Sequence, residues 1–349
     1  MHLIALSGGV DSSAALLLSK EKYGTSLLGA TLALAAPGSH DADADAKNIA
    51  DAAAVCETAG VNHTAVYAHD EFRAAVMDYF AREYLSGRTP NPCVVCNREI
   101  KFGLLADFAA QNGCDRVITG HYAKLENMNG YITIRKAADI TKDQSYVLAM
   151  LTQDQLRRAE FPLGNYTKPE IREMAGAAGL KNAQRRDSQD VCFIPDGDYV
   201  SFITRHTGEI PVPGDYIDEN GTVLGKHKGQ WCYTIGQRKG LGISMGRHVF
   251  VLAKDAVTNR VTLGDEAPLF QKTVSITGVH APSDPAWIAN DVKCRAKLRY
   301  AHREADAVFH RTSEHDGVIE FAEPQRAPSP GQFAVLYSED CVIGAGVIA

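Results

Sequence analysis

The sequence is poor in cysteine, with eight in 349 residues. That density is too low for a disulfide scaffold in a chain of this length. No apolar run approaches the ~18 residues that cross a membrane, so we expect no membrane association. The first residues, MHLIALSGG, carry no basic leader and no long apolar segment before a cleavage site. We therefore expect no secretory signal and a reducing, cytoplasmic location.

The sequence also lacks an excess of positive charge. Its 36 Lys and Arg residues are outnumbered by 42 Asp and Glu residues, which gives a net charge of -6. A generally basic nucleic-acid binder is excluded, and any contact with nucleic acid must come from local patches. Hydrophobic residues make up 45% and charged residues 22%, as in globular proteins. The length predicts two or three domains at ~150 residues each.

The first part of the chain alternates between short apolar runs and helical patterns. Strands are expected at Leu3–Leu6, Ser26–Leu34, His63–Tyr67 and Arg116–Thr119, and helices at Asp11–Lys20, Asp43–Ala59, Asp70–Leu85 and Glu99–Gln111. This alternation predicts an α/β fold with a doubly wound parallel sheet. Ligands of such sheets bind at the carboxyl ends of the strands, where Ser7-Gly8-Gly9 and Gly120-His121 are expected.

The composition of the sequence changes near Gly208, where Gly and Pro become frequent and short β-like runs recur. The runs are Gln230–Ile235, His248–Leu252, Arg260–Leu263, Lys293–Tyr300, Phe333–Tyr337 and Val342–Ile348. They predict small all-β modules appended to the α/β domain. We place the domains at 1–205, 206–270 and 271–349.

The strongest motif is the glycine-rich segment SGGVDSS at 7–13, between an expected strand and helix. Paired glycines let the backbone approach an anion, and the following amides hold a phosphate. Asp11 could orient the loop or bind Mg²⁺. No lysine ends the motif, so it is not of the Walker type. A merely capped helix would account for Asp11 and Ser12, but not for the glycine pair.

A second motif is RTPNPCVVCN at 88–97. Two prolines bracket Asn91, which predicts a stiff extended loop that presents a thiol. The pair Cys93 and Cys96 has three interpretations: a redox pair, half of a zinc site, or a nucleophile with a neighbour. A zinc site would need isolated Cys or His ligands, because the chain has no second CxxC and no HxxxH pair.

A third candidate site surrounds Cys192. Lys181, Arg185 and Arg186 precede this cysteine, and nearby cations lower a thiol pKa. The alternative is an inert buried cysteine beside apolar neighbours such as Phe193. We favour a nucleophile, because the chain also carries a phosphate loop and a second loop cysteine.

Local positive charge is concentrated in two places. Residues 220–254 contain no acid but hold Lys226, Lys228, Arg238, Lys239, Arg247 and Lys254. Further on, Lys293, Arg295, Lys297 and Arg299 alternate and would share one face of a strand. Such a face suits a polyanion, although acidic neighbours across the sheet could also neutralise it. The segment KDQSY at 142–146 could grip a sugar-phosphate backbone and stack a base.

Taken together, the motifs closely resemble those of the tRNA-specific 2-thiouridylases. The matching segments are LSGGVDSS (6–13), GRTPNPCVVCNREIKF (87–102), TGHYA (119–123), KDQSY (142–146), Lys168-Pro169, DSQDVCFI (187–194), TIGQRKGLG (234–242), Arg299-Tyr300 and PGQ (330–332). They follow the family's order and span nearly the whole chain. The resemblance implies an ATP-pyrophosphatase domain, a central β-rich module that contacts tRNA, and a C-terminal tRNA-contacting β-barrel.

The resemblance also implies a reaction. ATP would adenylate the 2-carbonyl oxygen of the wobble uridine, with Mg²⁺ and the glycine loop offsetting the charge of the leaving pyrophosphate. Cys192 would carry a persulfide received from a cysteine desulfurase or a persulfide carrier. Cys96 would then release the sulfur and leave a Cys96–Cys192 disulfide, or release hydrosulfide that attacks instead. An external reductant must restore both thiols.

Site residues carried over from the family fall into three groups. The implied ATP-binding residues are Ala5, Leu6, Ser7, Gly8, Gly9, Val10, Asp11, Ser12, Leu32 and Gly120. The implied contacts of the target base are Asn91, Pro92 and Cys93. The implied tRNA contacts are His121, Lys142, Asp143, Gln144, Ser145, Tyr146, Arg299, Tyr300 and Gln332.

The chain departs from the family's pattern at two places. Many members carry Asp, a candidate acid or base, where this chain has Cys93. Cys93 could replace that acid, act as a spare thiol or help bind metal. We assign the nucleophile to Cys96, because it directly precedes Asn97 as the family's cysteine does. The stretch at 34–40 also differs, so adenine contacts beyond Leu32 stay open.

Two other functions are compatible with parts of the pattern. An amide-forming ligase could use the same adenylating loop, and it would need neither Cys96 nor Cys192. A tRNA-binding or zinc-binding module without catalysis would tolerate substitution of Ser7 and Asp11.

Overall fold

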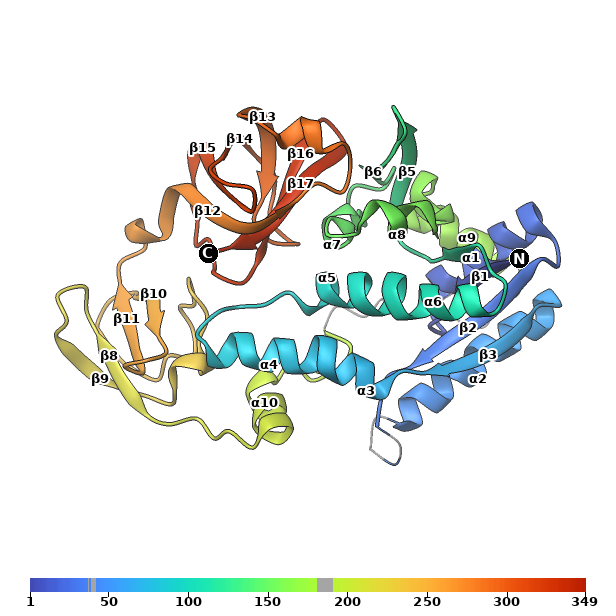
Figure 1. The fold of residues 1–349 in the computed structure, drawn as a ribbon. Coiled ribbons are helices and arrows are strands. Elements are labelled where there is room, and N and C mark those ends of the chain that lie inside the picture. Colours follow the sequence, from blue (N-terminus) through green and yellow to red (C-terminus); the bar gives the residue numbers. More distant parts are fainter. Residues whose placement is uncertain (37, 39–41, 181–190) are drawn as a thin grey trace.

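The computed structural model describes residues 1–36, 38, 42–180 and 191–349. The N-terminal domain is built on a parallel sheet with the order β3-β2-β1-β4-β7. Its strands are β1 (His2–Ala5), β2 (Leu27–Ala33), β3 (Asn62–Tyr67), β4 (Arg116–Ile118) and β7 (Ala159–Glu160). The predicted α/β architecture is confirmed, and Figure 1 shows the helices that accompany this sheet.

Helices α1 (Val10–Tyr23), α2 (Ala42–Ala59) and α9 (Lys168–Ala177) pack together beside the sheet. A continuous helical stretch runs from His69 to Leu85 as α3 (His69–Phe72), the π-turn η1 (Arg73–Met77) and α4 (Asp78–Leu85). A second runs from Pro92 to Gln111 as α5 (Pro92–Cys96), the π-turn η2 (Asn97–Leu104) and α6 (Leu105–Gln111). The two stretches contact each other through α5 and η1.

The prediction of an extended loop for both thiols is wrong. Cys93 and Cys96 lie in the first turn of α5, which begins seven residues before the expected start at Glu99. Asn91 caps this helix by accepting a hydrogen bond from the Cys93 amide at 3.1 Å. Pro92 occupies the first helical position, where its missing N–H costs nothing. The second of the two prolines that predicted a stiff loop therefore starts a helix, with Asn91 as its cap.

A hairpin of β5 (Ala123–Met128) and β6 (Tyr131–Lys136) leaves the N-terminal domain and meets the C-terminal one. Its turn places Asn129 at φ 54° and Gly130 at φ 88°, as a tight hairpin turn requires. Short helices follow: α7 (Ser145–Leu148), α8 (Gln153–Arg157) and the 3-10 turn η3 (Pro162–Asn165).

The central module begins with α10 (Tyr199–Thr207) and contains a four-stranded sheet of order β10-β11-β8-β9. The strands are β8 (Gly214–Ile217), β9 (Val223–His227), β10 (Phe250–Asp255) and β11 (Arg260–Gly264). The prediction of a strand at Gln230–Ile235 is wrong, because this stretch starts with the 3-10 turn η4 (Gln230–Cys232). Gly229 (φ 146°) and Gly236 (φ 83°) bend the chain at both ends, and Trp231 packs with Tyr84 and Phe202.

The C-terminal domain is a closed barrel of order β12-β15-β14-β13-β16-β17, completed by pairing of β12 with β17. Its strands are β12 (Phe270–His280), β13 (Val292–Lys297), β14 (Ala305–Arg311), β15 (Asp316–Arg326), β16 (Phe333–Ser338) and β17 (Cys341–Ile348), with the turns η5 (Ala267–Leu269) and η6 (Pro285–Ile288). The predicted β-barrel is confirmed. Within the described residues, no helix has the length and apolar character needed to span a bilayer.

Candidate active site

The glycine loop lies between β1 and α1 and is held by its own hydroxyl groups. Ser12 and Ser13 each donate to the carbonyl oxygen of Gly9 at 3.0 Å. The amide of Ser7 donates to Ser12 Oγ at 3.2 Å. Gly8 has φ +70°, and a Cβ there would lie 3.2 Å from the Asn48 carbonyl oxygen. The loop is therefore already folded into the shape that presents backbone amides to an anion.

The other expected nucleotide residues surround this loop. Ala5 ends β1, while the side chains of Leu6 and Val10 are buried and leave only their backbone available. Leu32 lies in β2, partly exposed. Gly120 follows β4, and a Cβ there would approach the Asp11 carbonyl carbon to 2.8 Å. The strand ends thus meet at one edge of the sheet, as the sequence predicts.

Asp11 has a cationic partner that sequence reasoning did not assign. The ammonium of Lys168, at the first position of α9, lies 2.8 Å from both carboxylate oxygens of Asp11. Lys168 is only 6% exposed. The hydroxyl of Tyr122 donates to Asp11 Oδ1 at 2.8 Å. Two features of the sequence could have identified this partner. Lys168-Pro169 matches a family segment, and Thr167 and Glu170 have the spacing of a capping box, which predicts that Lys168 lies at the start of a helix.

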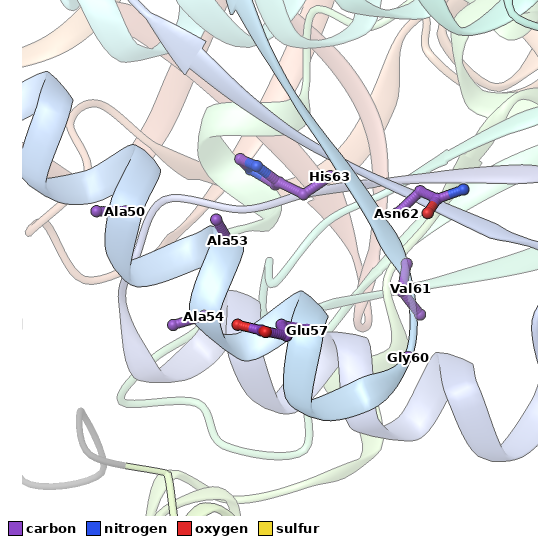
Figure 2. A pocket seen from close by; sticks show the side chains of 8 residues that line it. All are labelled: Ala50, Ala53, Ala54, Glu57, Gly60, Val61, Asn62 and His63. Atoms are coloured by element: carbon purple, nitrogen blue, oxygen red, sulfur yellow. The ribbon is translucent and has the colours of Figure 1, made fainter.

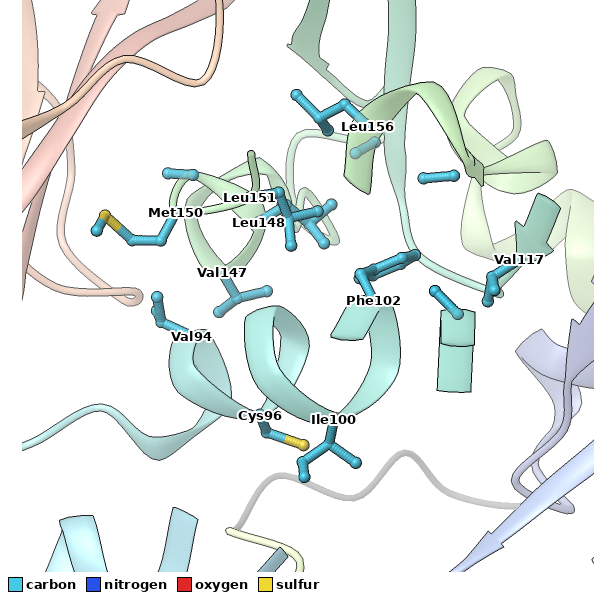
Figure 3. Packing of buried hydrophobic residues seen from close by; sticks show 14 of the residues in the cluster. Val94, Cys96, Ile100, Phe102, Val117, Val147, Leu148, Met150, Leu151 and Leu156 are labelled. Atoms are coloured by element: carbon cyan, nitrogen blue, oxygen red, sulfur yellow. The ribbon is translucent and has the colours of Figure 1, made fainter. Parts of the chain in front are cut away.

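The cysteines at 93, 96 and 192 lie close enough for their charges to interact. Burial raises the pKa of Cys192 to about 12, and ionised Cys96 and Cys93 would raise it further. Cys93 and Cys192 are nevertheless solvent-exposed, while Cys96 is buried. Figure 3 shows Cys96 pointing away from Val94 and Val147 across its helix. The three thiols therefore lie within the range of charge interaction.

Burial raises the pKa of Cys192, because desolvation outweighs the charge of a nearby cation. That cation is Lys101 of η2, whose charge partly offsets the rise that burial causes in the pKa of all three thiols. Lys181, Arg185 and Arg186, on which the expectation of a lowered pKa rested, lie outside the described residues. Sequence reasoning gave Lys101 no role, although it stands in the matched segment 87–102.

Phe193 anchors the chain immediately after Cys192. Its ring packs edge-on against Phe72 at 5.6 Å and Phe80 at 5.4 Å, and lies 5.0 Å from Phe202. These rings come from α3, α4 and α10, so three helices hold the segment. This packing keeps Cys192 beside α5 and argues against the inert buried cysteine, since Cys192 itself stays exposed.

The KDQSY segment connects the N-terminal domain to the barrel. Asp143 accepts from the Ser145 hydroxyl at 2.6 Å, and Tyr146 donates to the carbonyl oxygen of Phe333 at 2.8 Å. Asn91 hydrogen-bonds the same tyrosine hydroxyl. Asp143, Ser145 and Tyr146 are buried, whereas Lys142 and Gln144 are partly exposed. The segment thus has a structural role beside the tRNA contacts expected of it.

His121 is also buried, at 7% exposure, between the rings of Phe102 and Phe161. Its Nδ1 lies 2.6 Å from Thr119 Oγ1. Burial and the charge of Lys101 hold its pKa well below the usual value, so the ring is neutral near pH 7. Its expected contact with tRNA stays a prediction.

The barrel contributes a mixed charged and aromatic surface, in which Tyr300 lies within the range of charge interaction with Cys93. Lys297 lies 5.8 Å from the Tyr146 ring centre and 5.4 Å from that of Tyr300. Arg299 donates to the carbonyl oxygen of Arg326 at 3.0 Å, and Tyr300 is 42% exposed. The alternation prediction holds in β13, where Lys293 and Arg295 are exposed and Cys294 and Ala296 buried.

Part of this positive face is neutralised, as the alternative interpretation required. Arg295 lies 3.5 Å from Glu304, which also pairs with Lys136 at 2.7 Å. In the central module, Lys226 pairs with Asp215 at 2.6 Å and Arg247 pairs with Asp265. Arg238 and Lys239 are exposed, and Arg238 and Arg247 line a recess of about 380 Å³.

A larger recess of about 790 Å³ lies between α2 and β3 (Figure 2). Alanines, Glu57, Asn62 and His63 line it, and none of the sequence-predicted site residues does. His63 bonds Thr31 at 2.9 Å. Across the described ranges, no group of three or more His, Cys, Asp or Glu side chains is arranged to hold a metal ion.

Family models match the chain in three consecutive segments. The tRNA methyl transferase HUP domain matches residues 2–196, the tRNA methyl transferase PRC-barrel domain 200–265, and the Aminomethyltransferase beta-barrel domain 274–348. The chain is 41% identical to the tRNA-specific 2-thiouridylase MnmA of Treponema denticola, covering 99% of this chain and 97% of that protein. The chain belongs to the tRNA-specific 2-thiouridylase family. The resemblance expected from the motifs is confirmed.

Other members of the 2-thiouridylase family are equally similar. MnmA of Heliobacterium modesticaldum is 42% identical, with 99% of this chain and 91% of that protein covered. Among solved structures, the U34-tRNA thiolase NcsA from Methanococcus maripaludis with its [4Fe-4S] cluster is 20% identical with a TM-score of 0.36, covering 59% of this chain and 67% of that one. The domain boundaries near 205 and 270 stay predictions.

Proposed function

We propose that this protein transfers sulfur, with ATP, to the 2-position of the wobble uridine of tRNA. The observation that carries the proposal is the proximity of Cys96 and Cys192, whose charges interact, on the domain that holds the glycine loop. Membership of the 2-thiouridylase family over the whole chain supports the same reaction.

The first step is adenylation of the base. The loop amides would hold the phosphates of ATP, and Lys168 would balance the charge that develops on the leaving pyrophosphate. Mg²⁺ would supply further neutralisation, and the carboxylate of Asp11 is the hard oxygen ligand that this ion prefers. The contacts of Asp11 with Lys168 and Tyr122 hold that carboxylate at the loop.

The second step transfers sulfur. The outer sulfur of a Cys192 persulfide bonds to C2 of the uridine, and AMP leaves with the original oxygen. Cys96 then attacks the inner sulfur, so the base keeps the outer sulfur and a Cys96–Cys192 disulfide forms. Alternatively, Cys96 first releases hydrosulfide, which attacks C2. A cysteine desulfurase or persulfide carrier would load Cys192, whose exposed position permits such access.

The barrel and the central module would bind tRNA around this site. Gln332, Tyr300 and Arg299 lie on the barrel side, and Asn91, Pro92 and Cys93 lie on the α5 side. The uncharged side chains suit a base rather than a phosphate, while Lys297 adds positive charge beside the two tyrosine rings.

Mass spectrometry of tRNA after incubation with ATP, Mg²⁺, a reductant and a persulfide donor (a cysteine desulfurase with cysteine) tests the proposal. We expect one sulfur in place of one oxygen at the wobble uridine, and loss of that product in Cys96→Ser and Cys192→Ser proteins. An amide-forming ligase would keep ATP–pyrophosphate exchange in both variants and would leave tRNA unmodified. That outcome would contradict sulfur transfer and would favour an amide-forming ligase as the function of this protein.

A further inference from the structure

We propose that Cys93 is a third redox thiol. It forms a disulfide with Cys96 by exchange with the Cys96–Cys192 disulfide, which frees Cys192 for the next persulfide. This inference rests on the proposed function, since that disulfide is a product of sulfur transfer. It gives a role to the cysteine that stands where many family members carry Asp.

The helix places Cys93 and Cys96 on one face. They are three residues apart in the helical segment that begins at Pro92. Side chains at this spacing have Cβ atoms ~5–6 Å apart, so a small side-chain and backbone adjustment brings the sulfur atoms within bonding range. The hydrogen bond from the Cys93 amide to Asn91 fixes the first turn in which this pair lies.

Cys93 also lies within the range of charge interaction with the other two thiols. An ionised Cys93 raises the pKa of Cys96 and that of Cys192. Cys96 is buried at 8% exposure, whereas Cys93 and Cys192 are exposed. Cys96 is therefore the buried thiol of the three, with two accessible thiols as alternative partners.

The exchange is balanced and needs no oxidant. The Cys93 thiolate attacks Cys96 Sγ, the bond between Cys96 and Cys192 breaks, and a Cys93–Cys96 bond forms. The Cys192 thiolate that leaves takes up the proton that Cys93 lost. The charge of Lys101 favours the Cys93 thiolate against burial. An external dithiol then reduces the Cys93–Cys96 disulfide and is itself oxidised, which completes the cycle.

Disulfide mapping of the full-length protein tests this relay without tRNA. The reduced protein is treated with one equivalent of diamide, acid-quenched, alkylated and digested, and the linked peptides are identified by mass spectrometry. We expect the Cys93–Cys96 link with alkylated Cys192 in the wild type, and the Cys96–Cys192 link in Cys93→Ser. Cys232→Ser serves as the matched control, because Cys232 lies in the central module and its variant should map like the wild type.

Three results would overturn the relay. The first is a wild-type protein that retains the Cys96–Cys192 link with Cys93 alkylated. The second is a Cys93→Ser protein that forms no Cys96–Cys192 link. The third is a stoichiometric bound metal that is lost with Cys93, since ligated thiols are not free to exchange. Failure of tRNA thiolation in the wild type would instead contradict the proposed function, because the mapping does not depend on that reaction.

Turnover kinetics provide a second readout. During thiolation with limiting dithiol, the Cys93→Ser protein should show a burst of product followed by a slow phase, because Cys192 stays locked in the first disulfide. The wild type and Cys232→Ser should show a smaller difference between the two phases. Equal ratios of burst to steady-state rate in Cys93→Ser and wild type would contradict the relay.

Discussion

The side-chain amide of Gln332 donates a hydrogen bond at 3.1 Å to the carbonyl oxygen of Pro90, across 242 residues of sequence. The same amide donates to Thr89 at 2.9 Å. A backbone bond from the Thr89 amide to the Pro330 carbonyl at 2.7 Å adds to this contact. The C-terminal barrel therefore positions the segment that leads into α5, the helix that carries Cys93 and Cys96. The barrel thus contributes to the candidate site as well as to the expected binding of tRNA.

We predict that Gln332→Ala lowers tRNA thiolation while the affinity for ATP measured without tRNA stays near its original value. Each hydrogen bond removed is worth ~1 kcal/mol, so the effect on alignment should exceed the effect on stability. Steady-state thiolation kinetics and thermal unfolding measure both effects. Gln325→Ala is the control, since the Gln325 side chain donates only to nearby Glu323 within the described residues. Equal activity in both variants would contradict the prediction.

Replacing Lys168 should impair adenylation. Lys168→Met removes the ammonium that contacts Asp11 and leaves a partly buried carboxylate without that partner. Loss of one preorganised charge at a leaving group costs about 100-fold or more in rate. ATP–pyrophosphate exchange is the measurement. Lys22→Met, which breaks an ion pair with Glu160 on the far side of α1, should exchange normally. A Lys168→Met protein that is as active as this control would contradict a role for Lys168 in adenylation.

Gly120→Ala should disrupt the nucleotide loop. Its Cβ would lie 2.8 Å from the Asp11 carbonyl carbon and 2.9 Å from the Ser12 nitrogen, and backbone atoms cannot rotate away. We expect weaker ATP binding by titration calorimetry. Gly176→Ala in α9 meets nothing within 4 Å, and it should raise stability by ~0.5–1 kcal/mol with ATP affinity intact. Unchanged ATP affinity in Gly120→Ala would show that the loop is not the nucleotide site.

Alkylation of Cys192 should depend steeply on pH. Burial raises the pKa of this thiol to about 12, so the neutral form dominates below that value and the reactive thiolate grows as pH rises. Iodoacetamide labelling, mapped by mass spectrometry, should accelerate about tenfold per pH unit through pH ~10, whereas an ordinary cysteine with a pKa of ~8.5 levels off. A plateau of Cys192 labelling near pH 8 to 9 would contradict the raised pKa.

Removal of Arg295 and Lys297 should weaken tRNA binding and flatten its dependence on salt. Each phosphate that the protein no longer neutralises reduces the slope of log affinity against log salt by ~0.7–0.9. Filter binding at several salt concentrations measures the slope. Because Arg295 also pairs with Glu304, the larger effect is expected from Lys297. Lys272→Ala on β12, paired with Glu320, is the control, and an unchanged slope in the double variant would refute the role.

Local sequence determined the parts of the site that depend on neighbouring residues. The run at Leu3–Leu6, the glycine pair and Asp11 predict a strand, a turn and a helix, because each preference acts within a few residues. For the cysteine segment, the sequence predicts the right position but the wrong conformation. Proline is compatible with both an extended loop and a helix start, and only the cap by Asn91 decides between them.

The tertiary structure alone decided how these parts act together. Lys168 reaches Asp11 over 157 residues, and Gln332 reaches Pro90 over 242, which no local pattern encodes. The pKa of Cys192 likewise depends on how much protein surrounds the thiol, and cations near it in sequence did not predict the direction. Sequence thus determined the chemical groups and their local backbone, whereas distance and desolvation arise only when segments far apart in the chain pack, within a domain or between domains.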